Sequence, residues 1–146
     1  MNSRVKKEAL APKKPVLKPE DLARLMAQLA LDRKIHDLVI LDVRGLSSYA
    51  DFILVASARS ARHVQGVADY LEEELYKQHI TPLGIEGTTE GQWVLMDYGD
   101  VVFHLFFEPV REFYDIEGLW MDAARIKPED WGLVIPETTE EKNESE

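Results

Sequence analysis

Two strand-like runs separated by a glycine-containing turn constrain the fold of this chain more than any other feature. The runs cover residues 92–97 and 100–106, and the dipeptide Tyr98-Gly99 between them predicts a two-residue hairpin turn. With this turn, Asp97 lies opposite Asp100, and Trp93 lies opposite His104. The sequence therefore predicts a β-hairpin with defined facing pairs.

Alternation along the two strands separates their side chains into two faces. One face is uniformly apolar and is expected to pack against the core, whereas the other mixes aromatic, aliphatic and polar groups. A mixed face could bind a partner, or it could be buried under a helix with its Trp in the core. Composition alone favours burial, because large aromatic side chains are mostly buried. The apolar face comprises Val94, Met96, Val101, Phe103 and Leu105, and the mixed face comprises Trp93, Leu95, Val102, His104 and Phe106.

Length indicates one domain, and the absence of Cys fits a reducing compartment without proving one. The 146 residues suffice for one core, and the absence of Cys excludes disulfides, thiol nucleophiles and thiolate zinc sites. No apolar run approaches the ~20 residues of a membrane span, and no secretory signal of ~7–15 apolar residues is present. We expect a cytoplasmic bacterial protein. An organellar counterpart is less favoured, because import peptides are rich in Arg and Ser and the N-terminal segment of this chain is not.

The net charge of −10 is distributed unevenly. Residues 1–18 carry +5 and residues 137–146 carry −4, which leaves −11 for the residues between them. We expect a flexible basic arm over 1–18 and a disordered acidic tail over 137–146. An acidic core is a poor direct binder of phosphate backbone and suits a basic protein partner better, although the arm could contact RNA. The alternative is that the acidic excess only keeps the protein soluble.

Periodicity predicts a helix, two strands, a second helix and three more strands, followed by a short helical end. The first helix is expected to begin at Pro19, and the second after Ser60, whose hydroxyl can cap it. The strands before the hairpin are expected at 38–41, 51–56 and 83–87. This order predicts an α/β (α+β-like) mixed sheet of about five strands with helices packed against it.

The expected domain covers residues 19–120, and residues 121–136 form a C-terminal extension. Within this extension, Trp131, Leu133 and Ile135 alternate like an edge strand or a strap.

The segment from Gly45 to Ile53 occupies the position of the Gly-Ser turn and Asp-x-Asp pair of a nucleotidyltransferase. Such enzymes need two carboxylates on one strand face to hold two metal ions. Here Asp51 matches the first Asp of the pair, but Ile53 stands at the position of the second, and an aliphatic side chain cannot bind a metal ion. A residual transferase would have to combine Asp51 with Asp97 or Asp100.

The four His match no zinc spacing, and neither a nucleophile elbow nor a phosphate-binding loop is present. We therefore predict no catalytic residues, no metal site, no cofactor and no enzymatic activity.

A series of short motifs follows one another in a specific order over roughly residues 18–120. They are the run from Lys34 to Val43, Ser47 to Phe52, Ser57 to Ser60 with Arg62 to Val64, Glu86-Gly87, Trp93 to Asp97, Gly99 to His104, and Arg111 to Trp120. This series resembles the ribosomal silencing factor family, also called RsfS or Iojap, which has mitochondrial and plastid counterparts.

The resemblance implies a nucleotidyltransferase-like fold and a binding activity rather than an enzymatic one. Family members dock on large-subunit ribosomal protein L-fourteen and sterically block joining of the two subunits. They thereby repress translation when nutrients are scarce, and they are also linked to large-subunit maturation.

The family's motifs, carried onto this sequence, imply a partner-binding surface around the hairpin. With an acidic core and a basic ribosomal target, Trp93 becomes an expected interface anchor among carboxylates. For Leu119 and Trp120 we instead expect a small core under the last helix. The same face could also pair two copies into a homodimer. The expected partner-binding residues are Trp93, Leu95, Asp97, Asp100, His104, Arg111, Tyr114 and Glu117.

Overall fold

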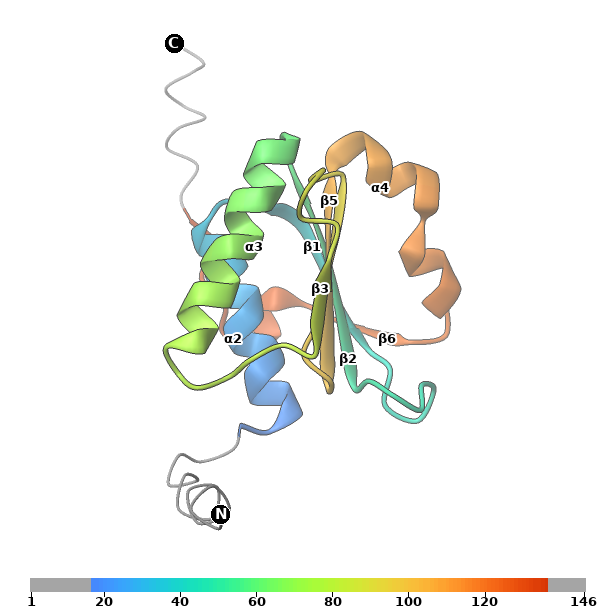
Figure 1. Ribbon diagram of the computed structural model, residues 1–146. Coiled ribbons are helices and arrows are strands. Elements are labelled where there is room, and N and C mark those ends of the chain that lie inside the picture. The colour runs from blue at the N-terminus through green and yellow to red at the C-terminus, as the bar shows by residue number, and fades with distance from the viewer. Residues whose placement is uncertain (1–16, 137–146) are drawn as a thin grey trace, which may run out of the picture.

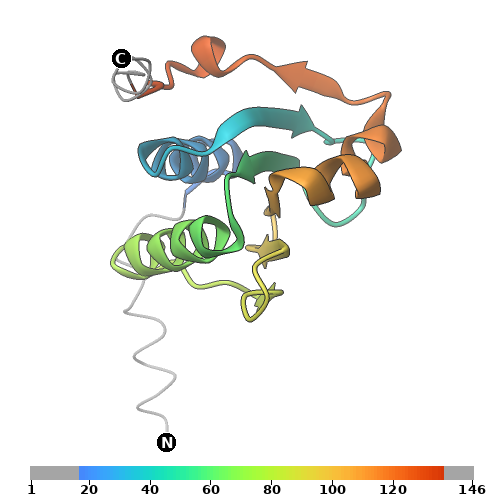
Figure 2. The same cartoon turned by 90° about the horizontal axis from the view of Figure 1, so that it is seen from above.

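A computed structural model describes residues 17–136, which form a six-stranded mixed sheet with helical elements on both faces (Figures 1 and 2). The mixed α/β architecture is confirmed, with one strand more than the five expected. Most of the predicted basic arm (residues 1–16) and the predicted acidic tail (residues 137–146) lie outside the described residues. None of the described helices has the length and hydropathy to cross a membrane.

The elements follow the predicted order and continue beyond it with a short strand and two 3-10 helices. Along the sheet the strand order is β3-β4-β5-β2-β1-β6; β2 and β5 are parallel, and the other neighbouring pairs are antiparallel. The elements are α2 (Pro19–Asp32), β1 (His36–Asp42), β2 (Phe52–Ala58), α3 (Ala61–Tyr76), β3 (Gly84–Glu86), β4 (Trp93–Asp97), β5 (Val101–Phe107), α4 (Glu108–Tyr114), η1 (Ile116–Trp120), β6 (Ala124–Ile126) and η2 (Pro128–Trp131).

The main core lies between the sheet and the helices α2 and α3. Every residue of the central strand β2 is buried, as expected for a strand that is apolar on both faces. The predicted apolar face of the hairpin packs into this core, together with the apolar stripes of both helices. Helix α3 begins where the sequence predicts, because the Ser60 hydroxyl accepts a hydrogen bond from the His63 backbone N–H at 3.0 Å.

The hairpin between β4 and β5 turns one residue later than predicted. The Tyr98 N–H donates to the Val101 carbonyl at 2.9 Å, so Gly99 and Asp100 are the central residues of the turn. Gly99 has a φ of +90°, and a type II′ turn requires a positive φ at its first central position. The predicted turn at Tyr98-Gly99 is therefore wrong.

The later turn changes the strand register but not the two faces. Asp97 pairs with Val102 rather than with Asp100, and Trp93 pairs with Phe106 rather than with His104. The partner residues shift by two positions, and a shift of two keeps each side chain on its face. The division into an apolar and a mixed face is thus correct, although the predicted facing pairs are not.

The elements α4 and η1 fold back over the mixed face and cover much of it (Figure 2). Between them and the sheet lies a smaller core, against which Trp120 packs as expected. The same expectation is wrong for Leu119, whose side chain is 73% exposed. The buried residues of this smaller core are Leu41, Val43, Ile53, Val55, Phe106 and Ile116.

The C-terminal extension contains an edge strand and a strap, at different positions. The edge strand is β6, which pairs with β1 and precedes the alternating residues. Farther along, the Trp131 ring packs edge-on against Phe52, with 5.5 Å between ring centroids. The Gln28 side chain on α2 then bonds to both backbone groups of Val134, at 2.8 and 2.9 Å. Residues 128–136 therefore form a strap held on α2.

Candidate protein-docking site

The elements β4, β5 and α4 bring four aromatic rings together, and we call Trp93, His104, Phe106 and Tyr114 the aromatic cluster. Between ring centroids, Trp93 lies 5.0 Å from Phe106, 4.7 Å from Tyr114 and 5.9 Å from His104. Phe106 is fully buried, Trp93 is partly buried, and Tyr114 is 49% exposed. The aromatic cluster therefore extends from the smaller core to the protein surface.

A hydrogen bond inside the aromatic cluster satisfies the polar atom of Trp93. The indole Nε1–H donates to Nδ1 of His104 at 3.1 Å. An accepting Nδ1 requires a neutral imidazole with its proton on Nε2, and burial lowers the pKa of His104 to about 4. Because the indole N–H is already bonded, a docking partner would meet the Trp93 ring rather than its donor.

A hollow of about 510 Å³ opens beside the aromatic cluster, between α4 and the start of β4. Phe113 is 80% exposed, and its ring stands at 89° to the Tyr114 ring with 5.0 Å between centroids. The helical spacing of Phe113 with Ile116, Leu119 and Trp120 predicts a helix that packs these side chains on the sheet, and this prediction is wrong for Phe113. The lining residues are Gly87, Glu90, Gln92, Trp93, Pro109, Val110, Phe113 and Tyr114. The hollow thus has aromatic walls and a single carboxylate.

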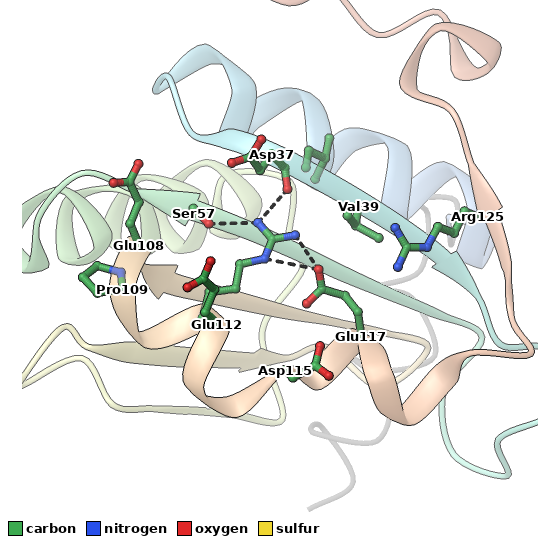
Figure 3. A pocket seen from close by; sticks show the side chains of 11 residues that line it. Asp37, Val39, Ser57, Glu108, Pro109, Glu112, Asp115, Glu117 and Arg125 are labelled. Carbon is green, nitrogen blue, oxygen red and sulfur yellow. Dashed lines mark hydrogen bonds and ion pairs between the residues drawn. The ribbon is translucent and has the colours of Figure 1, made fainter.

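Arg111 ties α4 to the sheet and to η1. Figure 3 draws its bonds to Asp37, Ser57 and Glu117 as dashed lines. Its guanidinium donates to the Asp37 carbonyl at 2.7 Å, to the Ser57 hydroxyl at 2.8 Å and to Glu117 Oε2 at 2.7 Å. Burial acts to raise the pKa of Glu117, but the hydrogen bond and charge of Arg111 outweigh burial, and this pKa is lowered. The ion-paired side chains are only 12% and 17% exposed. Arg111 and Glu117 therefore hold the aromatic cluster's helix in place.

A second hollow, of about 790 Å³, lies around this ion pair (Figure 3). Carboxylates outnumber cationic groups in its lining. The carboxylates belong to Asp37, Glu108, Glu112, Asp115 and Glu117, and the cations to Arg111 and Arg125. The surface next to the aromatic cluster is consequently acidic.

The structure divides the eight predicted partner-binding residues into three groups. The first belongs to or adjoins the aromatic cluster, the second is the ion pair, and the third lies at the hairpin turn. These groups are Trp93, Leu95, His104 and Tyr114; Arg111 and Glu117; and Asp97 and Asp100.

The two hairpin carboxylates do not surround Trp93, contrary to expectation. Asp97 is four residues along β4 from Trp93, a distance of ~13 Å for an extended strand. Its Oδ1 accepts a hydrogen bond from the Gly99 N–H at 2.8 Å, so this carboxylate supports the turn. Asp100 uses its backbone carbonyl to accept from the Asp51 N–H at 2.8 Å.

Ile53 stands where a nucleotidyltransferase would carry its second metal-binding carboxylate, and its side chain is packed in the core. Ile53 is 4% exposed and belongs to the smaller core. Within residues 17–136, no group of three or more His, Asp or Glu side chains could hold a metal ion.

The fold and this site define a mixed α/β domain whose aromatic surface is suited to contact with another macromolecule. The family model described as "Ribosomal silencing factor during starvation" matches residues 16–146. The chain belongs to the ribosomal silencing factor family, as the order of motifs predicts.

Relatives and a solved structure agree with this assignment. The chain is 36% identical over 110 residues to "Ribosomal silencing factor RsfS" of Halalkalibacterium halodurans, which covers 75% of this chain and 94% of that protein. It is 28% identical to the mouse "Mitochondrial assembly of ribosomal large subunit protein 1", with 79% of this chain and 56% of that protein covered. A crystal structure of a Chromobacterium violaceum protein superposes with a TM-score of 0.69 at 31% identity, covering 83% of this chain and 92% of the other.

Proposed function

We propose that this protein binds the large ribosomal subunit of a bacterial cytoplasm and sterically prevents the small subunit from joining it. Membership in the ribosomal silencing factor family supports the ribosome as the target. The surface that carries the proposal is the exposed end of the aromatic cluster with Phe113. Binding itself represses translation in this scheme, without a catalytic step.

The proposed partner within the subunit is ribosomal protein L-fourteen, which the motif series implied. A basic protein surface complements the acidic surface next to the aromatic cluster, because carboxylates outnumber cations in the hollow around the Arg111–Glu117 ion pair. Complementary charge mainly accelerates association and excludes wrong partners, whereas affinity comes from a few buried anchors. Tyr114 and Phe113 are the proposed anchors, because they are exposed before binding.

Trp93 has a different role in this proposal from the exposed anchor that the sequence suggested. Its ring packs between Phe106 and Tyr114, and its N–H is bonded to His104. It therefore supports Tyr114 from below and forms the floor of the hollow that a partner side chain would enter. A role in large-subunit maturation is compatible with the same docking, and the name of the mouse relative, a mitochondrial large-subunit assembly protein, points to such a role.

Subunit joining in sucrose gradients tests this function. Purified large and small subunits are mixed with excess protein, and wild type is expected to reduce the peak of joined ribosomes. Tyr114→Ala is expected to weaken large-subunit binding by about 2 kcal/mol, or roughly 30-fold. The matched control is Tyr76→Ala, which removes a 69% exposed Tyr from α3 on the opposite face of the sheet.

Two results would count against the proposal, at different levels. An unchanged joined peak with excess wild-type protein would remove the anti-joining function. Equal binding by Tyr114→Ala and Tyr76→Ala would leave the function intact but move the docking surface elsewhere. Direct binding to isolated L-fourteen, measured by calorimetry, then decides whether this protein is the partner.

A further inference from the structure

A cluster of basic side chains lies on the face of the sheet that α2 and α3 cover, away from the aromatic cluster. Arg33 and Lys34 follow the end of α2, while Arg59 and Arg62 flank the start of α3, and all four are exposed. Because α2 and α3 run in opposite directions, these two ends lie together (Figure 1). We call these four residues the basic patch.

His63 fixes the two halves of the basic patch relative to each other. Its Nδ1 accepts a hydrogen bond from the Arg59 backbone N–H at 3.1 Å, and its Nε2 lies 2.8 Å from the Arg33 carbonyl. With Nδ1 accepting, Nε2 carries a ring proton and donates it to that carbonyl. The four cations are thus presented by a connected backbone rather than by two independent loops.

Much of the positive charge in the basic patch is not neutralised within the described protein. Neither Arg59 nor Arg62 forms an ion pair with a residue in the range 17–136. The Arg33 guanidinium stacks over the Tyr70 ring, 4.3 Å from its centroid, and a neutral ring does not cancel the charge. Other basic side chains of the chain, such as Arg44 and Arg111, are paired with carboxylates.

The basic patch borders a hollow of about 810 Å³ whose lining is of mixed charge. Arg33, Lys34 and Arg59 contribute cations to it, and two carboxylates, Asp37 and Glu108, also line it. The Glu108 carboxylate contacts the His36 ring at the edge of this hollow. Arg62 precedes His63, which lines the hollow, and adds a further exposed cation at the start of α3.

We propose that the basic patch binds the phosphate backbone of ribosomal RNA when the protein is docked on the large subunit, an inference that rests on the proposed function. Guanidinium groups recognise phosphate oxygens with paired N–H donors, and the large subunit exposes RNA around its proteins. The net charge of the chain does not oppose this, because exposed charges farther apart than the ~8 Å screening length at physiological salt act nearly independently. The protein would then contact the subunit at two places, through the aromatic cluster and through the basic patch.

The test is the salt dependence of binding to purified large subunits, measured with the full chain. The variant carries Arg59→Gln and Arg62→Gln, which leave the His63 bond intact because that bond uses the Arg59 backbone. Loss of two phosphate contacts is expected to weaken binding about tenfold or more near 0.1 M salt. It should also flatten the slope of log affinity against log salt by about 1.4–1.8.

The matched control removes the same charge from the opposite ends of the same two helices. Lys18 precedes α2 and Lys77 follows α3, so Lys18→Gln with Lys77→Gln is expected to leave affinity and slope close to wild type. A patch variant that binds like wild type, or a control that loses as much as the patch variant, overturns the proposal while the docking function stands. Failure of wild type to bind large subunits at any salt concentration overturns both. Circular dichroism of each variant confirms that the fold is retained.

Discussion

The indole N–H of Trp93 is bonded to a ring nitrogen of His104 that can accept only while the imidazole is neutral. Burial lowers the pKa of His104 from 6.5 to about 4, so the unfolded chain takes up this proton at a higher pH than the folded protein does. The contribution of His104 to stability is therefore complete above about pH 6.5 and is lost as the pH falls toward about 4. Between pH 7 and pH 5 the expected loss is about 2 kcal/mol.

Denaturant unfolding at pH 7 and pH 5 measures this loss. In His104→Gln the titrating group is absent, so the free energy of unfolding should change less between the two pH values than it does in wild type. The difference between the two changes is expected to be about 2 kcal/mol. Identical pH dependence in both proteins would show that His104 does not carry this proton linkage.

The ion pair between Arg111 and Glu117 is a structural element of the site in addition to a predicted binding feature. Removing Arg111 with Arg111→Met leaves a mostly buried carboxylate and two further acceptors without their donor, and we expect a loss of roughly 2–3 kcal/mol. Glu117→Gln removes the negative charge of the same ion pair. In the double variant the losses should not add, because each single change already breaks the pair. Unfolding free energies of the four proteins give the coupling, and strict additivity would contradict a direct interaction.

Gly87 controls where β4 begins and therefore where Trp93 lies. Its φ is +89°, and a Cβ at this position would collide with the Trp93 carbonyl oxygen. Gly87→Ala is therefore expected to cost roughly 2 kcal/mol or more and to alter the near-ultraviolet spectrum of Trp93. Gly84→Ala is the matched control in β3, where an added Cβ has no neighbour within 4 Å. Similar stability of the two variants would mean that the backbone at Gly87 adapts without strain.

The sequence predicts those features of this fold that depend on a period of two or 3.6 residues. The faces of β4 and β5 are correct even though the register is not, because an error of two positions preserves alternation. The position of the turn instead depends on which of its two central residues needs a positive φ. The sequence predicts Gly99 as the second central residue of the turn, whereas in the structure it is the first. The starts of α2 and α3 depend on short-range signals, and the sequence predicts them correctly from Pro19 at the first helical position and from the Ser60 cap.

The site was harder to predict because it depends on elements with no strong pattern. Strand β6 has three residues without an apolar run, and η1 is a single 3-10 segment, so neither gives a periodic signal. Tertiary packing decides that Ile116 is buried while Leu119 is exposed, although both fit a helical stripe. Equally, nothing local indicates that α4 covers His104 and Phe106. The family's motifs identified Trp93 and Tyr114, but only the fold distinguishes the supporting ring from the exposed one.

The last prediction concerns the strap over residues 128–136. Gln28 is its polar attachment to α2, since its side-chain amide donates to the Val134 carbonyl and accepts from the Val134 N–H. Gln28→Ala removes both bonds, and also the 3.1 Å bond from the Gln28 amide to Asp32 Oδ1 within α2. It keeps a residue with high helix propensity, and a loss of about 1–2 kcal/mol is expected. Asp69→Ala, at an exposed position of α3, controls for a polar-to-Ala change on a helix surface.

Amide hydrogen exchange locates the effect of Gln28→Ala within the molecule. Detachment of the strap should speed exchange at Val134 and at Leu133, whose N–H is bonded to the Pro128 carbonyl, before it affects the strands of the sheet. Trp131 should stay protected on the main core through its contact with Phe52, because that contact does not involve Gln28. Unchanged exchange at Val134 would show that apolar packing alone holds the strap. A uniform rise across the whole domain would instead mean that the strap and the sheet unfold as one unit.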